Sequence, residues 1–133
     1  MAMDEDFCLL GLLSDDPDYK LCWRINQSLD TNFEKVDDLK LFHRKLQGDQ
    51  LFSIFEYADE EAMLTYRIIK NRSDQGYFLE EVKNIDFLVH IQGEVYEDGI
   101  HKFMQSLSVL SSVRMCLPVE LARIRNMERL LLW

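Results

Sequence analysis

The chain has 133 residues, of which 47% are hydrophobic and 29% are charged, a composition typical of a folded protein that excludes a largely disordered one. Its formal net charge of −9 disfavours nucleic acid as a partner, because an acidic surface repels the phosphate backbone. We therefore expect one globular domain over residues 1–133 and no nucleic-acid partner.

The N-terminus and the cysteines indicate the compartment. The first six residues include three acidic and no basic side chains, whereas a secretory signal peptide begins with a basic region. The apolar run from Phe7 to Leu13 is much shorter than the roughly 20 residues that span a bilayer. Cys8, Cys22 and Cys116 are widely spaced, which is typical of reduced thiols and not of a disulfide framework. We expect a cytoplasmic protein with no membrane partner.

The first elements are the most clearly marked. Residues 7–13 are predicted to form a strand that is apolar on both faces and therefore lies inside a sheet. Asp16 and Pro17 then predict the start of a helix, with the Asp16 carboxylate as its cap. The helix is expected to reach Leu29, and its core face should consist of Leu21, Cys22, Ile25 and Leu29.

Short apolar runs separated by turn residues predict several strands in the middle of the chain. We expect a strand at 33–41, a hairpin formed by 51–57 and 63–70, and a turn at 73–76. Residues 85–92 alternate between apolar and polar side chains. Leu88 is the only apolar residue on the face that carries His90, so this face is expected to be partly exposed to water.

The C-terminal third predicts a second amphipathic helix after Gly99, a strand at 111–117 and a short helix after Pro118. Residues 130–133 could close the chain as an edge strand, through which two copies could form a homodimer. The expected fold is α+β, a two-layer sandwich in which two main helices pack on a mixed, largely antiparallel sheet.

No motif in the chain identifies a reaction. His43, His90 and His101 lack the spacing of metal ligands, and no pair of cysteines has the C-x-x-C spacing. Phosphate loops, dinucleotide fingerprints and nucleophile elbows do not occur in the sequence. We expect no catalytic residue, metal ligand or cofactor and favour a protein without enzymatic activity, although the 24 acidic residues leave an acid–base pair open.

Five residues are candidates for a binding site. Tyr19, Trp23 and Asn26 fall on one side of the first helix, at positions i, i+4 and i+7. One interpretation places them at the edge of the core with polar tips in water, and the other makes them a patch for a partner or ligand. Glu81 precedes the strand that carries His90, and either residue could border a pocket.

Two blocks of sequence resemble a known family. Residues 9–14 read Leu-Leu-Gly-Leu-Leu-Ser, and residues 18–26 read Asp-Tyr-Lys-Leu-Cys-Trp-Arg-Ile-Asn. They are similar to the strand and helix of the bacterial IPExxxDY family, which is found in the Bacteroidetes group. In the signature that names the family, this chain has Leu-Glu-Glu at 79–81 and Asp-Phe at 86–87. The resemblance implies a small intracellular protein without an established activity and supplies no catalytic residues.

These observations lead to two hypotheses. The first is a non-catalytic interaction or regulatory module that contacts a protein partner through the acidic surface beside Tyr19, Trp23 and Asn26. The alternative is a protein that binds or converts a small molecule in a pocket between helix and sheet, with His90 or Glu81 at the edge of that pocket.

Overall fold

The computed structural model describes residues 7–133. Within that range a six-stranded sheet has the order β10-β1-β9-β6-β5-β2, and neighbouring strands are all antiparallel. The predicted α+β class, with a largely antiparallel sheet, is thereby confirmed. The strands of this sheet are β1 (Phe7–Leu13), β2 (Glu34–Lys35), β5 (Ile54–Asp59), β6 (Leu64–Lys70), β9 (Phe87–Gln92) and β10 (Met115–Pro118).

Strand β1 lies inside the sheet, as its doubly apolar pattern predicts. It pairs with β9 on one side and with β10 on the other. Leu10 and Leu12 join the core on one face of the sheet, and Leu9 joins the core on the opposite face. A Cβ atom at Gly11 would lie 2.7 Å from the Ile85 side chain, so the glycine allows Ile85 to pack directly on the strand.

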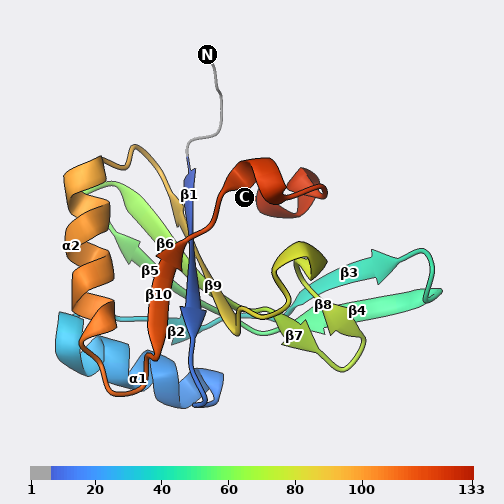
Figure 1. Cartoon of the computed structure of the whole chain (residues 1–133), viewed down its shortest axis with the longest axis horizontal. Coiled ribbons are helices and arrows are strands. Elements are labelled where there is room, and N and C mark those ends of the chain that lie inside the picture. Colours follow the sequence, from blue (N-terminus) through green and yellow to red (C-terminus); the bar gives the residue numbers. More distant parts are fainter. Residues whose placement is uncertain (1–6) are drawn as a thin grey trace.

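Helices α1 (Asp18–Leu29) and α2 (Glu97–Ser108) pack on the same face of the sheet, at the left of Figure 1. The α1 residues Leu21, Cys22 and Ile25 are fully buried there, as the periodicity predicts. From α2, Leu107 is fully buried and its apolar neighbours are partly buried against the same core. The two predicted main helices and their core faces are therefore present.

The start of α1 differs from the prediction in one respect. Pro17 occupies the cap position, and the helix has no side-chain cap hydrogen bond. The Asp16 carboxylate instead accepts a hydrogen bond from the Ser112 hydroxyl and lies 3.8 Å from Lys20 Nζ and 3.6 Å from Arg24 Nε. Asp16 therefore ties the helix start to a distant segment, although its negative charge still lies near the positive end of the helix dipole.

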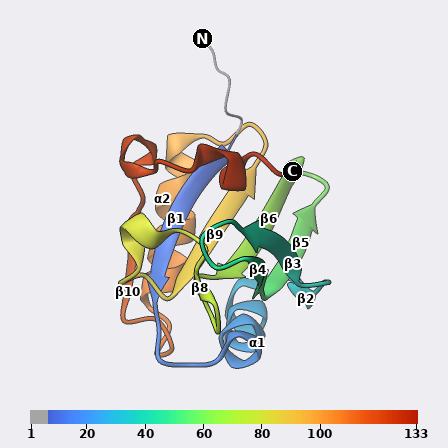
Figure 2. The same ribbon diagram turned by 90° about the vertical axis from the view of Figure 1, so that its right-hand side faces the viewer.

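Two hairpins extend from the sheet at the right of Figure 1 and face the viewer in Figure 2. They consist of β3 (Leu39–His43) with β4 (Gly48–Phe52), and β7 (Arg72–Ser73) with β8 (Gly76–Tyr77). The predicted strand at 33–41 is thus divided between β2 and β3. The predicted strand at 51–57 is divided at Ser53, whose hydroxyl donates a hydrogen bond to the Asp18 carboxylate.

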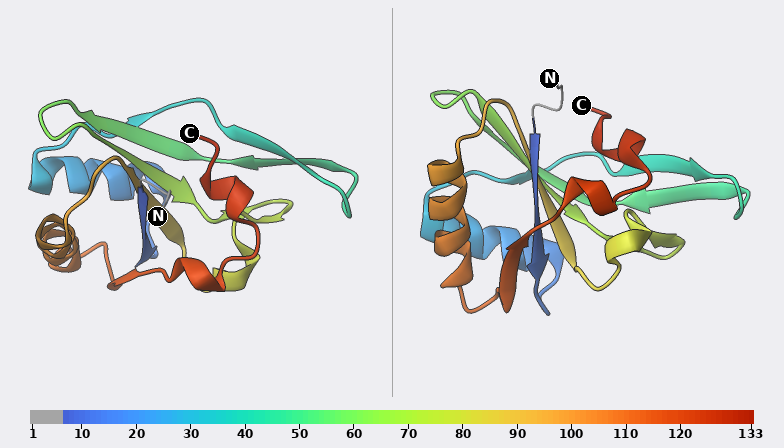
Figure 3. Two further views of the ribbon diagram at one scale, coloured as in Figure 1. Left: turned by 90° about the horizontal axis from the view of Figure 1, so that it is seen from above. Right: turned by 45° about the horizontal axis from the view of Figure 1, so that its top comes forward.

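A second core fills the face of the sheet that the helices leave open. It is covered by the β3–β4 hairpin and by three short 3₁₀ helices: η1 (Glu80–Val82), η2 (Leu121–Arg123) and η3 (Met127–Leu130). Figure 3 shows the C-terminal segment on this side of the sheet, away from α1 and α2. The fully buried residues of this second core include Phe52, Phe78, Leu79, Leu88 and Leu130.

The C-terminal segment changes two predictions about this face. Residues 130–133 do not form an edge strand, because η3 turns the chain so that Leu130 enters the core. On the face of β9 that carries His90, the C-terminal segment covers the centre and leaves His90 1% exposed, so that only Asp86 and Gln92 at the two ends stay partly exposed. Residues 130–133 therefore offer no edge strand for a homodimer, and homodimer formation itself stays a prediction.

Candidate functional site

The most accessible of the five candidate side chains lie on α1. Tyr19 is 67% exposed and Trp23 is 60% exposed, although the opposite side of the same helix is buried in the core. Large aromatic side chains are enriched at protein interfaces, where they bury much area at a small cost in entropy. The exposures favour a surface patch over the edge of the core. We refer to Tyr19 and Trp23 as the α1 aromatic pair.

Asn26 has a different role from the α1 aromatic pair. Its Oδ1 accepts hydrogen bonds of 2.8 Å from the Phe33 N–H and from the Thr31 hydroxyl, and its Nδ2 donates to the Phe33 carbonyl over 3.1 Å. These bonds use both ends of the amide to hold the connection between α1 and β2. Asn26 is therefore a structural residue next to the patch and not part of its contact surface.

The segment that contains α1, residues 7–38, is acidic, and its own basic residues are paired. Residues 7–38 contain seven acidic and three basic side chains. Lys20 and Arg24 lie within 4.0 Å of Asp16, and Lys35 Nζ lies 2.6 Å from Asp38. The remaining carboxylates of this segment favour a basic partner, while Lys70, Arg72 and Lys83 lie beside Asp15 and Asp16 at the start of α1.

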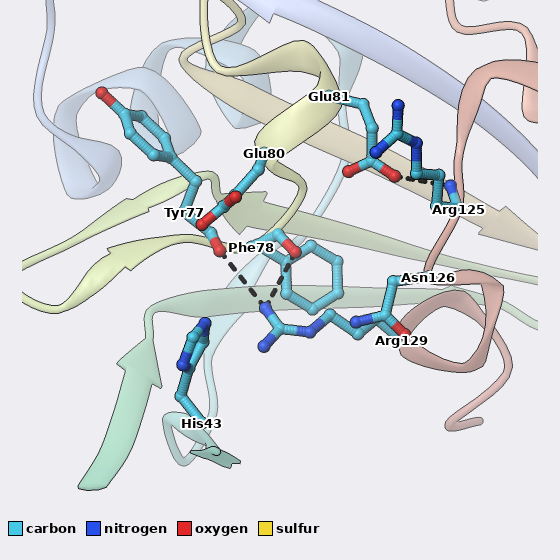
Figure 4. Close-up of a pocket in the computed structure, with 8 residues that line it drawn as sticks. All are labelled: His43, Tyr77, Phe78, Glu80, Glu81, Arg125, Asn126 and Arg129. Atoms are coloured by element: carbon cyan, nitrogen blue, oxygen red, sulfur yellow. Dashed lines mark hydrogen bonds between the residues drawn. The ribbon is translucent and has the colours of Figure 1, made fainter. Parts of the chain in front are cut away.

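Glu81 borders a polar cavity of about 400 Å³ on the other side of the sheet (Figure 4). The cavity lies between the β3–β4 hairpin, the segment from β8 to η1, and the C-terminal segment. The residues that line it are His43, Tyr77, Phe78, Glu80, Glu81, Arg125, Asn126 and Arg129.

The Glu81 carboxylate joins η1 to the C-terminal segment. It accepts a 2.5 Å hydrogen bond from the backbone N–H of Arg125. Burial tends to raise the pKa of Glu81, but hydrogen bonds from the backbone N–H groups of Arg125 and Asn126 outweigh it and bring the pKa below its usual value. Glu81 is therefore ionised at neutral pH and unsuited to act as a general acid.

Arg129 also uses its hydrogen bonds to join segments of the fold. It donates to the Tyr77 carbonyl over 3.2 Å, to the Phe78 carbonyl over 2.9 Å and to Gln50 Oε1 over 2.8 Å. Figure 4 shows its guanidinium pointing at the two carbonyls. Sequence reasoning missed this residue, and its only signal is the excess of arginine over acidic residues near the C-terminus. The polar groups of this cavity thus join three segments of the fold.

His90 is enclosed and does not line this cavity. Its Nε2 donates a 3.0 Å hydrogen bond to the Leu130 carbonyl, while its ring stacks on Phe7 at 4.8 Å and lies 5.0 Å from the Trp133 ring. Its Nδ1 has no hydrogen-bond partner among residues 7–133. Burial lowers the pKa of His90 to about 4, so the imidazole is neutral at physiological pH.

The structure does not bring the five candidates into one site. Asn26, Glu81 and His90 are occupied by contacts inside the fold, which leaves the α1 aromatic pair as the accessible candidate. A cavity does lie between α2 and the sheet, but neither His90 nor Glu81 lines it.

Within residues 7–133 no group of three or more His, Cys, Asp or Glu side chains is placed to hold a metal ion. No helix in the same range has the length and apolar character needed to cross a membrane. A comparison with protein-family models, curated proteins and solved structures finds no match to the chain. Membership of the IPExxxDY family therefore stays a prediction from the two sequence blocks.

Proposed function

We propose that this protein is a non-catalytic interaction module that binds a protein partner through the α1 aromatic pair. The observation that carries the proposal is the exposure of Tyr19 and Trp23 on a helix whose other side is buried. Keeping two large aromatic rings in water has no benefit for the fold, because apolar surface is stabilised by burial. A partner that covers both rings would supply that burial.

The charge around the helix selects the kind of partner. A contact segment with an apolar centre and flanking lysine or arginine side chains would complement the aromatic pair and the carboxylates that remain around it. We place this interaction in the reducing cytoplasm, a proposal that the free thiols of Cys8, Cys22 and Cys116 support.

Site-specific photocrosslinking tests the proposal. The photoreactive residue p-benzoylphenylalanine replaces Trp23 in one version of the full chain and Val109, which is 82% exposed and follows α2, in a matched control. In a native cell extract, we expect position 23 to capture a discrete protein that position 109 does not. Mass spectrometry should place the crosslink in a basic segment of that protein. Identical products from both positions would contradict the proposal.

A further inference from the structure

A second, chemically different site lies between α2 and the sheet. Its cavity of about 240 Å³ is formed by β6, by β9 and its connection to α2, and by the first turns of α2. The lining residues are Ala62, Leu64, Tyr66, Ile91, Glu94, Val95, Tyr96, Gly99, Ile100 and Phe103. A cavity that is mostly apolar and has a few polar groups at its edge is typical of small-molecule sites, and this volume suits a ligand the size of one aromatic ring.

Three aromatic side chains line the cavity, and each of them is supplied by a different segment. Tyr66 comes from β6 and Phe103 from α2, and their ring centroids lie 5.1 Å apart. Tyr96 comes from the connection before α2 and is 69% exposed, and the neighbouring Glu94 carboxylate raises the pKa of its hydroxyl. The faces of aromatic rings attract organic cations, and this attraction is the basis of ammonium recognition in aromatic cages.

Glu94 is the only charged residue among those that line the cavity, so the charged edge at its mouth is acidic. The two segments that border it, residues 59–63 and 93–99, contain no lysine, arginine or histidine. They do contain six carboxylates: Asp59, Glu60, Glu61, Glu94, Glu97 and Asp98. An anionic ligand would be repelled at this mouth, and a cationic ligand would be attracted.

Two glycines lie at the ends of segment 93–99, which borders the cavity. Gly93 has φ +125°, and a Cβ atom there would lie 2.7 Å from the Met63 carbonyl oxygen, so a glycine is needed for this connection to lie against the start of β6. Gly99 shows the opposite situation. A Cβ atom there would meet nothing within 4 Å, yet a glycine inside a helix costs up to about 1 kcal/mol relative to alanine. The space that a side chain at position 99 would enter adjoins the cavity.

We infer that this cavity binds a small organic ammonium ion, with the apolar body of the ligand between Tyr66, Ile100 and Phe103 and the charged group at the acidic mouth. The volume of the cavity limits the size of the ligand, and the aromatic rings provide contacts for the cation. The carboxylates favour a positively charged ligand over a negatively charged one. This site is independent of the α1 aromatic pair.

Three probes of similar shape test the inference by NMR titration of the isotopically labelled full chain. Phenethylamine is cationic, phenethyl alcohol is neutral and phenylacetate is anionic. We expect phenethylamine to shift the amide signals of Val95, Gly99 and Ile100 and to bind about tenfold more tightly than phenylacetate, with the alcohol between them. In the Glu94→Gln variant, this ratio should fall to about threefold.

Substitutions at one position provide the matched control. Gly99→Leu places a side chain beside the cavity and should weaken phenethylamine binding at least about tenfold, whereas Gly99→Ala should retain the affinity. The amide spectrum of each variant shows that it is folded. Shifts confined to other parts of the chain would overturn the inference, as would equal affinity for all three probes. The titration of the wild-type chain decides the question even if Gly99→Leu does not fold.

Discussion

The buried imidazole of His90 makes the stability of this protein sensitive to mild acid. Burial lowers the pKa of His90 to about 4 in the folded protein, whereas an unfolded chain has the ordinary value of 6.5. Below pH 6.5 the unfolded state therefore takes up a proton that the folded state does not, and unfolding becomes more favourable as the pH falls. Well above pH 6.5 the imidazole is neutral in both states, and this source of instability disappears.

The size of the effect follows from the same two values. Between pH 7 and pH 5, the linkage relation gives a loss of about 2 kcal/mol in the free energy of unfolding from this one group. The loss approaches a limit of about 3 kcal/mol below pH 4, where the folded protein also becomes protonated. Such a change is a substantial part of the stability of a domain of this size.

Urea unfolding at pH 7 and at pH 5 measures this contribution in the wild type and in His90→Phe. The variant loses the hydrogen bond to the Leu130 carbonyl at both pH values, so it should be less stable at pH 7. Acidification from pH 7 to pH 5 should nevertheless lower the free energy of unfolding of the variant by about 2 kcal/mol less than that of the wild type. The titration of the carboxylates is common to both proteins and cancels in this comparison. His101→Phe, which changes an exposed imidazole on α2, should follow the wild type. An equal acid-induced loss in His90→Phe and wild type would refute this reasoning.

Three further predictions concern packing. Gly93→Ala should lower the free energy of unfolding by about 2 kcal/mol or more, whereas Gly99→Ala should raise it by about 0.5 to 1 kcal/mol. If thermal unfolding shows that both variants are stabilised or both are destabilised, the geometry is contradicted. Asn71→Ala should cost about 3 kcal/mol in urea unfolding, because this fully buried amide bonds to three backbone groups; a cost below about 1 kcal/mol would mean that water replaces those bonds. The Cys22 thiol should react with a thiol reagent only after unfolding, because burial and the nearby Asp18 raise its pKa to about 12. Rapid labelling of the native chain that peptide mapping locates on Cys22 would contradict this.

Local signals were sufficient for the parts of the fold that depend on neighbouring residues. Strand β1 is predictable because side chains that are apolar on both faces require cover on both faces. Helix α1 is predictable because its apolar residues recur with the helical period after Pro17. The same period places Tyr19 and Trp23 away from the core, and their exposure agrees with it.

Contacts between distant residues account for the errors. The cover of His90 comes from Leu130, 40 positions later in the chain, and no local pattern indicates that pairing. The run at 130–132 is apolar whether it forms a strand or a turn, so the sequence does not distinguish the two. Asn26 has the spacing of the aromatic pair, but the loop that follows α1 folds back to bond its amide.

The cavity beside α2 was equally hidden from the sequence. Its walls come from β6, β9 and α2, which become neighbours only in the folded chain. In the sequence alone, the acidic residues near its mouth are indistinguishable from ordinary charged loop residues. A pocket between helix and sheet was expected in general terms, but its lining residues could not be named without the tertiary structure.

The central claim is that the α1 aromatic pair is a contact surface for a protein partner. The most direct test is calorimetric titration of the purified partner, identified by crosslinking at position 23, against the wild type and against the double variant Tyr19→Ala/Trp23→Ala. Val109→Ala serves as the control, and circular dichroism verifies the folds. The account predicts that the double variant binds at least about tenfold more weakly, while the control binds as tightly as the wild type. Equal affinity of the folded double variant and the wild type would contradict it.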